Sequence, residues 1–198
     1  MSQRIRRLAL AALAAIALIA PARAAETWTI DPSHSGVTFR GKHLVSIVPG
    51  RFTTFSGEFL FDEKAIEASS VTVSIDAASI TTDNEKRDGH LKSPDFFDTA
   101  TYPTITYKST KVKKIDATHF EVTGDLTMRG VTKPVILAVE YLGTSPGMGY
   151  GPRNGFHATT KLNRKDFGVN WNKTLDNGGL VVGDNVDIDL AIEAGPKQ

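Results

Sequence analysis

Cysteine is absent from this 198-residue chain, which excludes a disulfide framework and a lipid anchor attached to an N-terminal cysteine. The sequence also lacks a nucleophile elbow and a glycine-rich phosphate loop, which are common signatures of hydrolases and nucleotide-binding enzymes. Stability must therefore come from a hydrophobic core alone. A chain of this length suffices for one domain with such a core.

Long hydrophobic runs are scarce, and the clearest one lies near the N-terminus. Residues 8–20 are apolar, follow three arginines within residues 4–7, and precede a small-x-small motif at 22–24. The run is too short to span a bilayer comfortably, and the pattern is typical of a secretory signal peptide. We predict a signal peptide over residues 1–24 and a single domain over residues 25–198. The paired arginines leave both the Sec and the twin-arginine export routes open.

Neither sign of charge dominates the remaining chain. The predicted signal peptide holds four of the 23 basic side chains and none of the 22 acidic ones, so the mature chain would carry a net charge of −3. This charge balance does not indicate a positively charged surface that would bind nucleic acid, so no nucleic-acid partner is expected. No second hydrophobic segment follows, so we expect a soluble protein in the periplasm or, alternatively, outside the cell.

A period of two in hydrophobicity runs through most of the mature chain and predicts β-strands. The stretch 70–76 shows it most clearly, and longer alternations cover 51–61 and 180–194. We expect the first of these long strands to bend at Gly57. Eight or more strands with a single apolar face predict an all-β protein. A two-sheet sandwich and a closed barrel both satisfy this pattern.

The segment 83–98 interrupts the alternation with dense charge. Thr82 stands three residues before Glu85, which is the spacing of a capping box, and Ser93 before Pro94 is typical of the start of another helical turn. A residue before proline is disfavoured in a helix, so one helix should end near Ser93. We expect one or two short helical turns whose apolar side chains point inward.

Two segments that lose the alternation, 83–98 and 163–179, are predicted to cover an open end of the β structure. These covers and the length of the strands favour a barrel over a sandwich. A barrel of about eight strands is just wide enough to be filled by side chains or to hold one small ligand.

The five histidines show no short metal-ligand spacing. His34, His43 and His90 could in principle converge with Asp31 or Asp88 on an interior ion, but scattered histidines are more often ordinary hydrogen-bonding residues. We therefore predict no metal site.

The densest ionisable cluster comprises Arg87, Asp88 and His90. One interpretation is a salt-bridged turn on the surface. The other is that Arg87 or His90 meets a polar head group at the mouth of a cavity. The inward aromatic residues have two explanations as well, because they could fill a core or line a site for a long apolar ligand.

Six segments of the mature chain resemble stretches of one known family. They are WTIDPSHSGVTFRGKHL at 28–44, GRFTTFSGEFLFD at 50–62, SITTDNEKRDGHLKSPDFFDTATYPTI at 79–105, GDLTMRGVTKPV at 124–135, RKDFGV at 164–169 and GDNVDIDLAIEA at 183–194. The family that they resemble is the YceI-like family of exported proteins that bind polyisoprenoid or related lipids. The segments occur in the family's order and cover essentially the whole mature chain, so together they are specific although each alone is weak.

The resemblance implies an extended eight-stranded antiparallel lipocalin-like barrel with one or two short helical caps. It also implies that a polyisoprenoid or similar long-chain amphiphile, such as an isoprenoid quinone or a prenyl phosphate, is held in an apolar cavity for transport or storage. No catalysis and no cofactor other than this lipid are expected. A homodimer and transient contact with a membrane both stay open.

The residues expected to contact the lipid are chosen by their place in the matching stretches and by which face of a strand they occupy (strand parity). We expect Arg87, His90 and His43 to contact its head group. The predicted lipid-binding residues are Phe39, His43, Phe55, Phe59, Val73, Ile75, Arg87, His90, Leu91, Phe97 and Trp171.

Two other functions stay open at this point. One is an enzyme acting on a lipid or quinone, with His34, His43 or His90 as acid–base groups. The other is a ligand-free stress or interaction protein whose barrel is filled by its own side chains.

Overall fold

A computed structural model describes residues 26–175 and 180–197, so the predicted signal peptide lies outside the described residues. The strands are β1 (Glu26–Ile30), β2 (Gly36–His43), β3 (Ser46–Phe52), β4 (Phe55–Phe61), β5 (Ser70–Asp76), β6 (Ile80–Thr81), β7 (Thr104–Lys114), β8 (His119–Met128), β9 (Val131–Ser145), β10 (Arg153–Asn163) and β11 (Val182–Pro196). The helices are α1 (Glu85–Lys92) and the 3₁₀ helices η1 (Ile66–Ala68), η2 (Ala77–Ser79), η3 (Gly147–Gly149) and η4 (Arg164–Phe167). Across the described ranges, no helix has the length and apolar character needed to cross a membrane.

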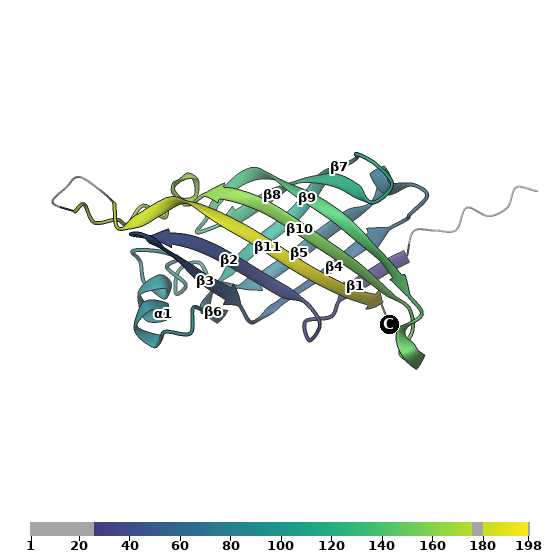
Figure 1. Ribbon diagram of the computed structural model, residues 1–198, viewed down its shortest axis with the longest axis horizontal. Coiled ribbons are helices and arrows are strands. Elements are labelled where there is room, and N and C mark those ends of the chain that lie inside the picture. Colours follow the sequence, from purple (N-terminus) through teal and green to yellow (C-terminus); the bar gives the residue numbers. More distant parts are fainter. Residues whose placement is uncertain (1–25, 176–179, 198) are drawn as a thin grey trace, which may run out of the picture.

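Eight strands pair in antiparallel fashion around a closed barrel (Figure 1). Their order is β1-β4-β5-β7-β8-β9-β10-β11, and the ring closes where β11 returns to β1, with Trp28 opposite Pro196 and Ile30 opposite Ala194. The predicted eight-stranded antiparallel barrel is confirmed. Closure satisfies the backbone groups that an open sheet would leave at its edges.

The strands β2, β3 and β6 extend this barrel at one end. β2 pairs with the first half of β11 and β1 with its last residues, so the two act as one strand broken at 31–35. A similar break at 53–54 separates β3 from β4. Phe52 and Phe55 flank this break and are both buried. Residues 53 and 54 lie outside the strands, so the alternation of inward and outward side chains does not continue across them.

The predicted bend at Gly57 is therefore wrong, since the chain breaks before β4 and not within it. Gly57 has a packing role instead. A Cβ there would lie 2.7 Å from Ile30 Cδ1 and 2.9 Å from the carbonyl oxygen of Thr72, so only glycine fits between these neighbours.

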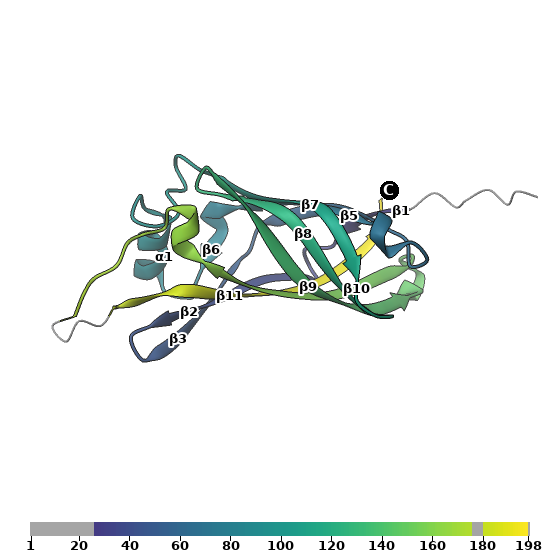
Figure 2. The same cartoon turned by 90° about the horizontal axis from the view of Figure 1, so that it is seen from above.

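The charged segment between β6 and β7 forms one α-helix at the extended end of the barrel (Figures 1 and 2). Its N-cap is Asn84, whose side chain accepts a hydrogen bond from the Arg87 amide at 3.0 Å. The predicted cap at Thr82 is wrong, because the Thr82 hydroxyl bonds the Asp88 carboxylate instead. The helix ends at Lys92 as predicted, but residues 94–97 form a turn, so one helical cap is present and not two.

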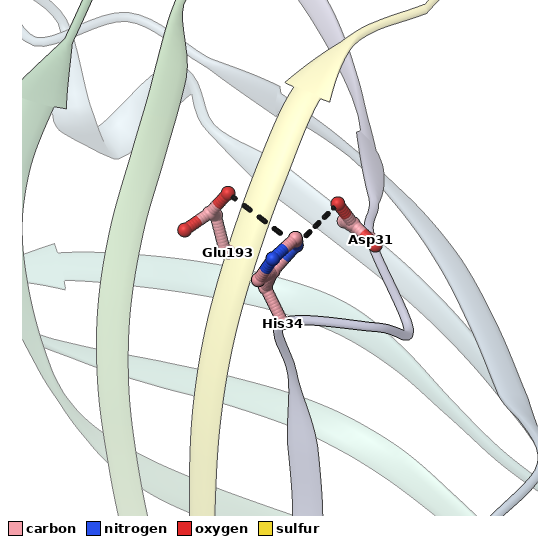
Figure 3. A group of neighbouring side chains, drawn as sticks. All are labelled: Asp31, His34 and Glu193. Carbon is pink, nitrogen blue, oxygen red and sulfur yellow. Dashed lines mark hydrogen bonds and ion pairs between the residues drawn. The ribbon is translucent and has the colours of Figure 1, made fainter. Parts of the chain in front are cut away.

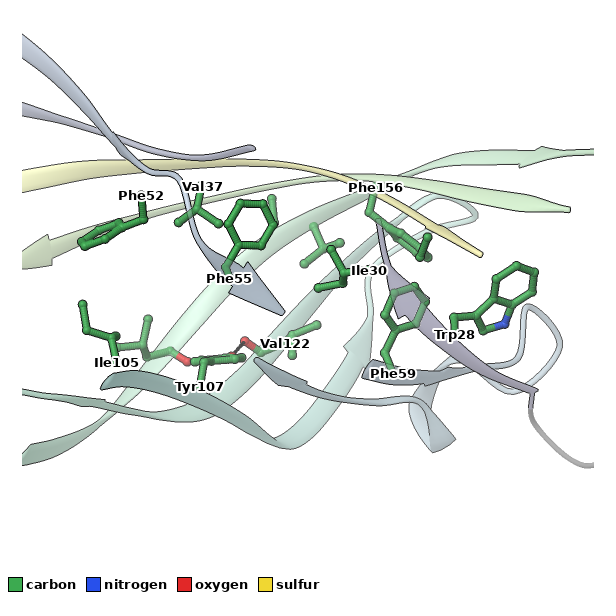
Figure 4. Packing of buried hydrophobic residues seen from close by; sticks show 14 of the residues in the cluster. Trp28, Ile30, Val37, Phe52, Phe55, Phe59, Ile105, Tyr107, Val122 and Phe156 are labelled. Atoms are coloured by element: carbon green, nitrogen blue, oxygen red, sulfur yellow. Dashed lines mark hydrogen bonds between the residues drawn. The ribbon is translucent and has the colours of Figure 1, made fainter. Parts of the chain in front are cut away.

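An aromatic cluster fills the barrel at the end opposite α1. Phe156 packs edge-on against Phe59 and Phe61, with ring centroids 5.2 and 5.0 Å apart, and lies 5.2 Å from Tyr141. Figure 4 shows Phe59 and Phe156 among the buried side chains that meet inside the barrel. Such pairs contribute about 0.5–1.5 kcal/mol each beyond the area that they bury.

Candidate functional site

A cavity of about 690 Å³ occupies the barrel interior. Its lining extends from Phe61 and Phe156 in the aromatic cluster to Lys42 and Trp171 at the end that carries α1. Pockets for small ligands commonly have volumes of roughly 300–1,000 Å³. The inward side chains therefore leave room for a ligand, whereas the alternative of a filled barrel requires that no such space exists.

All eleven residues predicted to bind lipid line this cavity, although their contact with a lipid stays a prediction. They are Phe39, His43, Phe55, Phe59, Val73, Ile75, Arg87, His90, Leu91, Phe97 and Trp171. The structure thus brings together residues from β2, β4, β5, α1 and the segments that follow α1 and η4.

The wall of the cavity is built by strand pairing. On the face shared by β4 and β5, Phe55 lies opposite Ile75 and Val73 lies opposite Gly57. Alternate residues of a strand point to the same face, so the apolar members of both strands face the cavity while their polar neighbours face outward. This is why strand parity identified the wall correctly.

Apart from the phenol of Tyr107, the ionisable side chains that line the cavity are all basic. No aspartate or glutamate lines it within residues 26–175 and 180–197. Sequence reasoning proposed three of these basic residues and missed three others. The complete set is Lys42, His43, Lys86, Arg87, His90 and Arg164, and all of them come from the segments at the α1 end. Lys42, Lys86 and Arg87 are exposed and also line the cavity, so the cavity opens at the α1 end, which we call the mouth. Basic side chains next to an apolar interior favour an anionic or hydrogen-bond-accepting group there.

Arg87 is held at the mouth by Thr82. Its Nε donates to the Thr82 hydroxyl oxygen at 2.7 Å and its Nη2 donates to the Thr82 carbonyl oxygen at 3.0 Å. Its Nη1 has no hydrogen-bond partner in the part of the chain that the structure describes. The Arg87 side chain is therefore oriented, with donor capacity left for a ligand.

Asp88 does not form the salt-bridged turn that one interpretation predicted. Its carboxylate accepts hydrogen bonds from the Thr81 hydroxyl at 2.8 Å and from the Thr82 amide at 2.8 Å. Partial burial alone would raise the pKa of Asp88, but the hydrogen bonds from Thr82 and Thr81 lower it below its ordinary value. The carboxylate thus fixes the start of α1 in place.

Three rings from different segments meet beside the mouth. His90 of α1 lies edge-on to Phe96 and to Trp171, with centroid separations of 4.9 and 4.8 Å, and Phe96 lies 5.3 Å from Trp171. His90 Nε2 is also 2.9 Å from the Asp95 carboxylate. This cluster joins α1 to the segment after η4 and covers part of the cavity.

Arg164 connects the segment after η4, which carries Trp171, to the barrel through hydrogen bonds. Its guanidinium donates to the carbonyl oxygens of Gly183 at 2.9 Å, Val169 at 2.6 Å and Trp171 at 2.8 Å. The side chain is only 6% exposed, and its Nη2 lies 3.5 Å from the Asp184 carboxylate. Burial lowers the pKa of Arg164, and the charge of Asp184 partly offsets that effect.

Two of the three candidate acid–base histidines, His43 and His90, line the cavity. His34 does not line the cavity, and Figure 3 shows it between Asp31 and Glu193 beside β11. Its Nδ1 is 2.9 Å from Asp31 and 4.0 Å from Glu193, and these three are the one group of described residues close enough to share a metal ion. Arg153 lies 3.6 Å from Glu193, so ion pairing accounts for the arrangement.

The Asp31–His34 pair predicts a measurable shift. The hydrogen bond that His34 donates to the Asp31 carboxylate, together with the negative charge of Asp31, raises the pKa of His34 above 6.5. Any stabilisation from this exposed pair is present below pH 6.5 and is lost as the pH rises through the raised value. Asp31→Asn should return the NMR titration midpoint of His34 toward 6.5. Asp189→Asn should leave that midpoint unchanged, and an unchanged midpoint in Asp31→Asn would contradict the assignment.

Comparison with known proteins adds independent information. The family model described as "YceI-like domain" matches residues 28–194. The protein YceI of Escherichia coli O157:H7 is 44% identical over 140 residues, which cover 70% of this chain and 73% of that protein.

Solved structures share the barrel. The YceI protein of Campylobacter jejuni superposes with a TM-score of 0.68 at 34% identity, covering 79% of this chain and 90% of that one. A polyisoprenoid binding domain from Saccharophagus degradans superposes with a TM-score of 0.60 at 19% identity, covering 86% of this chain and 98% of that one. At 19% identity the second likeness shows the shared fold.

Proposed function

The chain belongs to the YceI-like family, and we propose that it is an exported lipid-binding protein. The proposed ligand is a polyisoprenoid or similar long-chain amphiphile, held for transport or storage in the periplasm. The predicted signal peptide supports the proposed export. The description of the Saccharophagus degradans neighbour as a polyisoprenoid binding domain supports the ligand class.

The observation that carries this proposal is the cavity itself. It combines an apolar wall of strand residues with basic groups confined to one end, which matches the chemistry of a molecule with a long tail and a polar head. The family and the structural neighbours point to a binding protein and not to an enzyme.

Burial of the tail supplies the driving force in this proposal. Removing apolar surface from water is worth about 25 cal/mol per Å², so each further 100 Å² of tail contributes about 2.5 kcal/mol. The opposing terms are the ordering of the tail and the loss of its membrane environment. Affinity should therefore rise with chain length until the tail fills the cavity and should then level off.

A titration tests the proposal directly. Trp171 lines the cavity, so its fluorescence should report the entry of a prenyl chain offered from detergent micelles. We expect saturable binding of one chain per barrel and tighter binding for longer chains. No fluorescence change and no bound chain at saturating prenyl alcohol would contradict the proposal.

The basic mouth makes a separate prediction about the head group. Arg87→Ala should weaken binding of a prenyl phosphate about tenfold, because it removes a charged donor, and should change binding of the matching prenyl alcohol much less. Lys92→Ala is the matched control, since Lys92 is on the same helix but does not line the cavity. Equal losses for both ligands in Arg87→Ala would contradict a head-group role.

A further inference from the structure

Five aliphatic side chains are exposed at the end of the barrel that carries the cavity mouth. We call them the rim, and they are Leu44, Val45, Ile47, Leu175 and Leu180. Val45 is fully exposed and Ile47 is 60% exposed. Single exposed aliphatic residues are common, but a group at one end of a molecule needs an explanation.

Backbone hydrogen bonds join the segments that carry the rim, although these segments come from separate parts of the chain. The Leu44 amide donates to the Val181 carbonyl oxygen at 2.8 Å, and the Val181 amide donates to the Lys173 carbonyl oxygen at 3.1 Å. Thr174 and Leu180 form a further β-bridge. Figures 1 and 2 show the β2–β3 hairpin and the start of β11 extending together beyond the barrel at the α1 end.

The hairpin between β2 and β3 carries its apolar residues at a conformational cost. His43 pairs with Ser46, so Leu44 and Val45 form a two-residue turn. Leu44 has φ of 52°, a backbone conformation that glycine or asparagine normally provides in such turns. Val45 is fully exposed in this turn and buries nothing inside the chain, which indicates a function outside it.

Positive charge surrounds the rim. Lys42, Lys86 and Lys173 are exposed, and none of them forms an ion pair within residues 26–175 and 180–197. Lys42 and Lys86 also line the cavity, and among the described residues no aspartate or glutamate does. Exposed aliphatic side chains flanked by lysines are complementary to a bilayer surface that contains anionic lipid.

We propose that the rim docks the cavity mouth on an anionic lipid bilayer. Leu44, Val45 and Ile47 enter the interface between head groups and acyl chains, and the lysines contact lipid phosphates. Docking places the mouth against the bilayer, so a lipid tail can pass between membrane and cavity without crossing water. This inference rests on the proposed function, because it names the surface from which the ligand is taken or to which it is delivered.

Flotation with vesicles of phosphatidylethanolamine and phosphatidylglycerol tests the proposal. The wild-type chain should float with these vesicles, less at high salt, and less with phosphatidylcholine alone. The double variant Val45→Ser/Ile47→Ser should bind at least tenfold more weakly. Met148→Ser/Tyr150→Ser is the matched control, because these side chains are 95% and 83% exposed near η3 at the opposite end. Lys173→Glu should weaken binding in proportion to the phosphatidylglycerol content, whereas Lys111→Glu on β7 should not.

Uptake measured from detergent micelles separates this inference from the proposed function. The rim variant should load a prenyl chain from micelles like the wild type but extract it from vesicles at least tenfold more slowly. Equal flotation of rim and control variants, or no flotation of the wild type, would overturn the docking proposal while leaving lipid binding intact. A wild-type dimer that the rim variant converts to monomer, without vesicle binding, would also overturn it, because the rim would then join two copies.

Discussion

Replacing Val73 with aspartate is expected to abolish retention of a long-chain lipid at neutral pH. Val73 lines the cavity from the middle of β5, opposite Gly57, and packs against the apolar core. A carboxylate there would face the tail in an environment without water, where a charged group is strongly disfavoured. We expect affinity to fall by at least about a hundredfold, which corresponds to about 2.7 kcal/mol.

The adjacent position provides the control for this variant. Ser74→Asp adds the same charge one residue along β5, but its side chain is exposed on the outer face, so lipid binding should stay unchanged. Burial raises the pKa of the introduced carboxyl in Val73→Asp, so binding should partly recover at lower pH as that group becomes neutral. A folded Val73→Asp protein with full lipid occupancy at neutral pH would contradict the assignment of the cavity wall.

Replacing Arg164 with methionine is expected to destabilise the barrel and speed lipid release. The guanidinium holds the carbonyl oxygens of Gly183, Val169 and Trp171, and methionine offers no donor for them. Leaving such buried groups unpaired should lower the free energy of unfolding by about 3 kcal/mol. The freed segment carries Trp171, so the rate of release measured by stopped-flow fluorescence should also rise.

Lys165→Met is the matched control for Arg164→Met. Lys165 is the next residue and bonds the same Asp184 carboxylate at 2.9 Å, but its side chain is 40% exposed. An exposed ion pair contributes about 0–1 kcal/mol, so this variant should unfold in urea at nearly the wild-type concentration. Similar losses in the two variants would show that charge near Asp184 matters and that the carbonyl contacts of Arg164 do not.

Much of the fold could be predicted from the sequence because each strand has one apolar face. Closure of the sheet into a barrel could not be predicted from the residues alone, because the alternation of apolar and polar residues is the same in a sandwich and in a barrel. It depends on the pairing of β1 with β11, which lie at opposite ends of the described chain. The sequence pattern also missed the break between Phe52 and Phe55, where the inward-facing positions change from even to odd residue numbers. A break of two residues leaves no signal in composition, although it decides which side of the sheet each aromatic residue faces.

Part of the site could likewise be predicted from the sequence, and part could not. Parity placed Phe59 and Val73 on the wall correctly because they lie within regular strands. Lys42 and Lys86 were missed because strand parity fixes the direction of neither. Lys42 is near the end of β2, where its neighbour His43 also lines the cavity, and Lys86 is on a helix. Arg164 stands among charged residues, and nothing in the local sequence marks it as buried. Its burial depends on carbonyl groups that tertiary structure brings around it.

Native mass spectrometry of the mature protein, purified from its own cell envelope without detergent and then extracted with solvent, tests the central claim most directly. We predict a stoichiometric adduct that survives as a complex and is released on extraction as a long-chain prenyl species, whose mass would identify the ligand. An empty protein that also fails to take up prenyl chains from detergent would contradict the account.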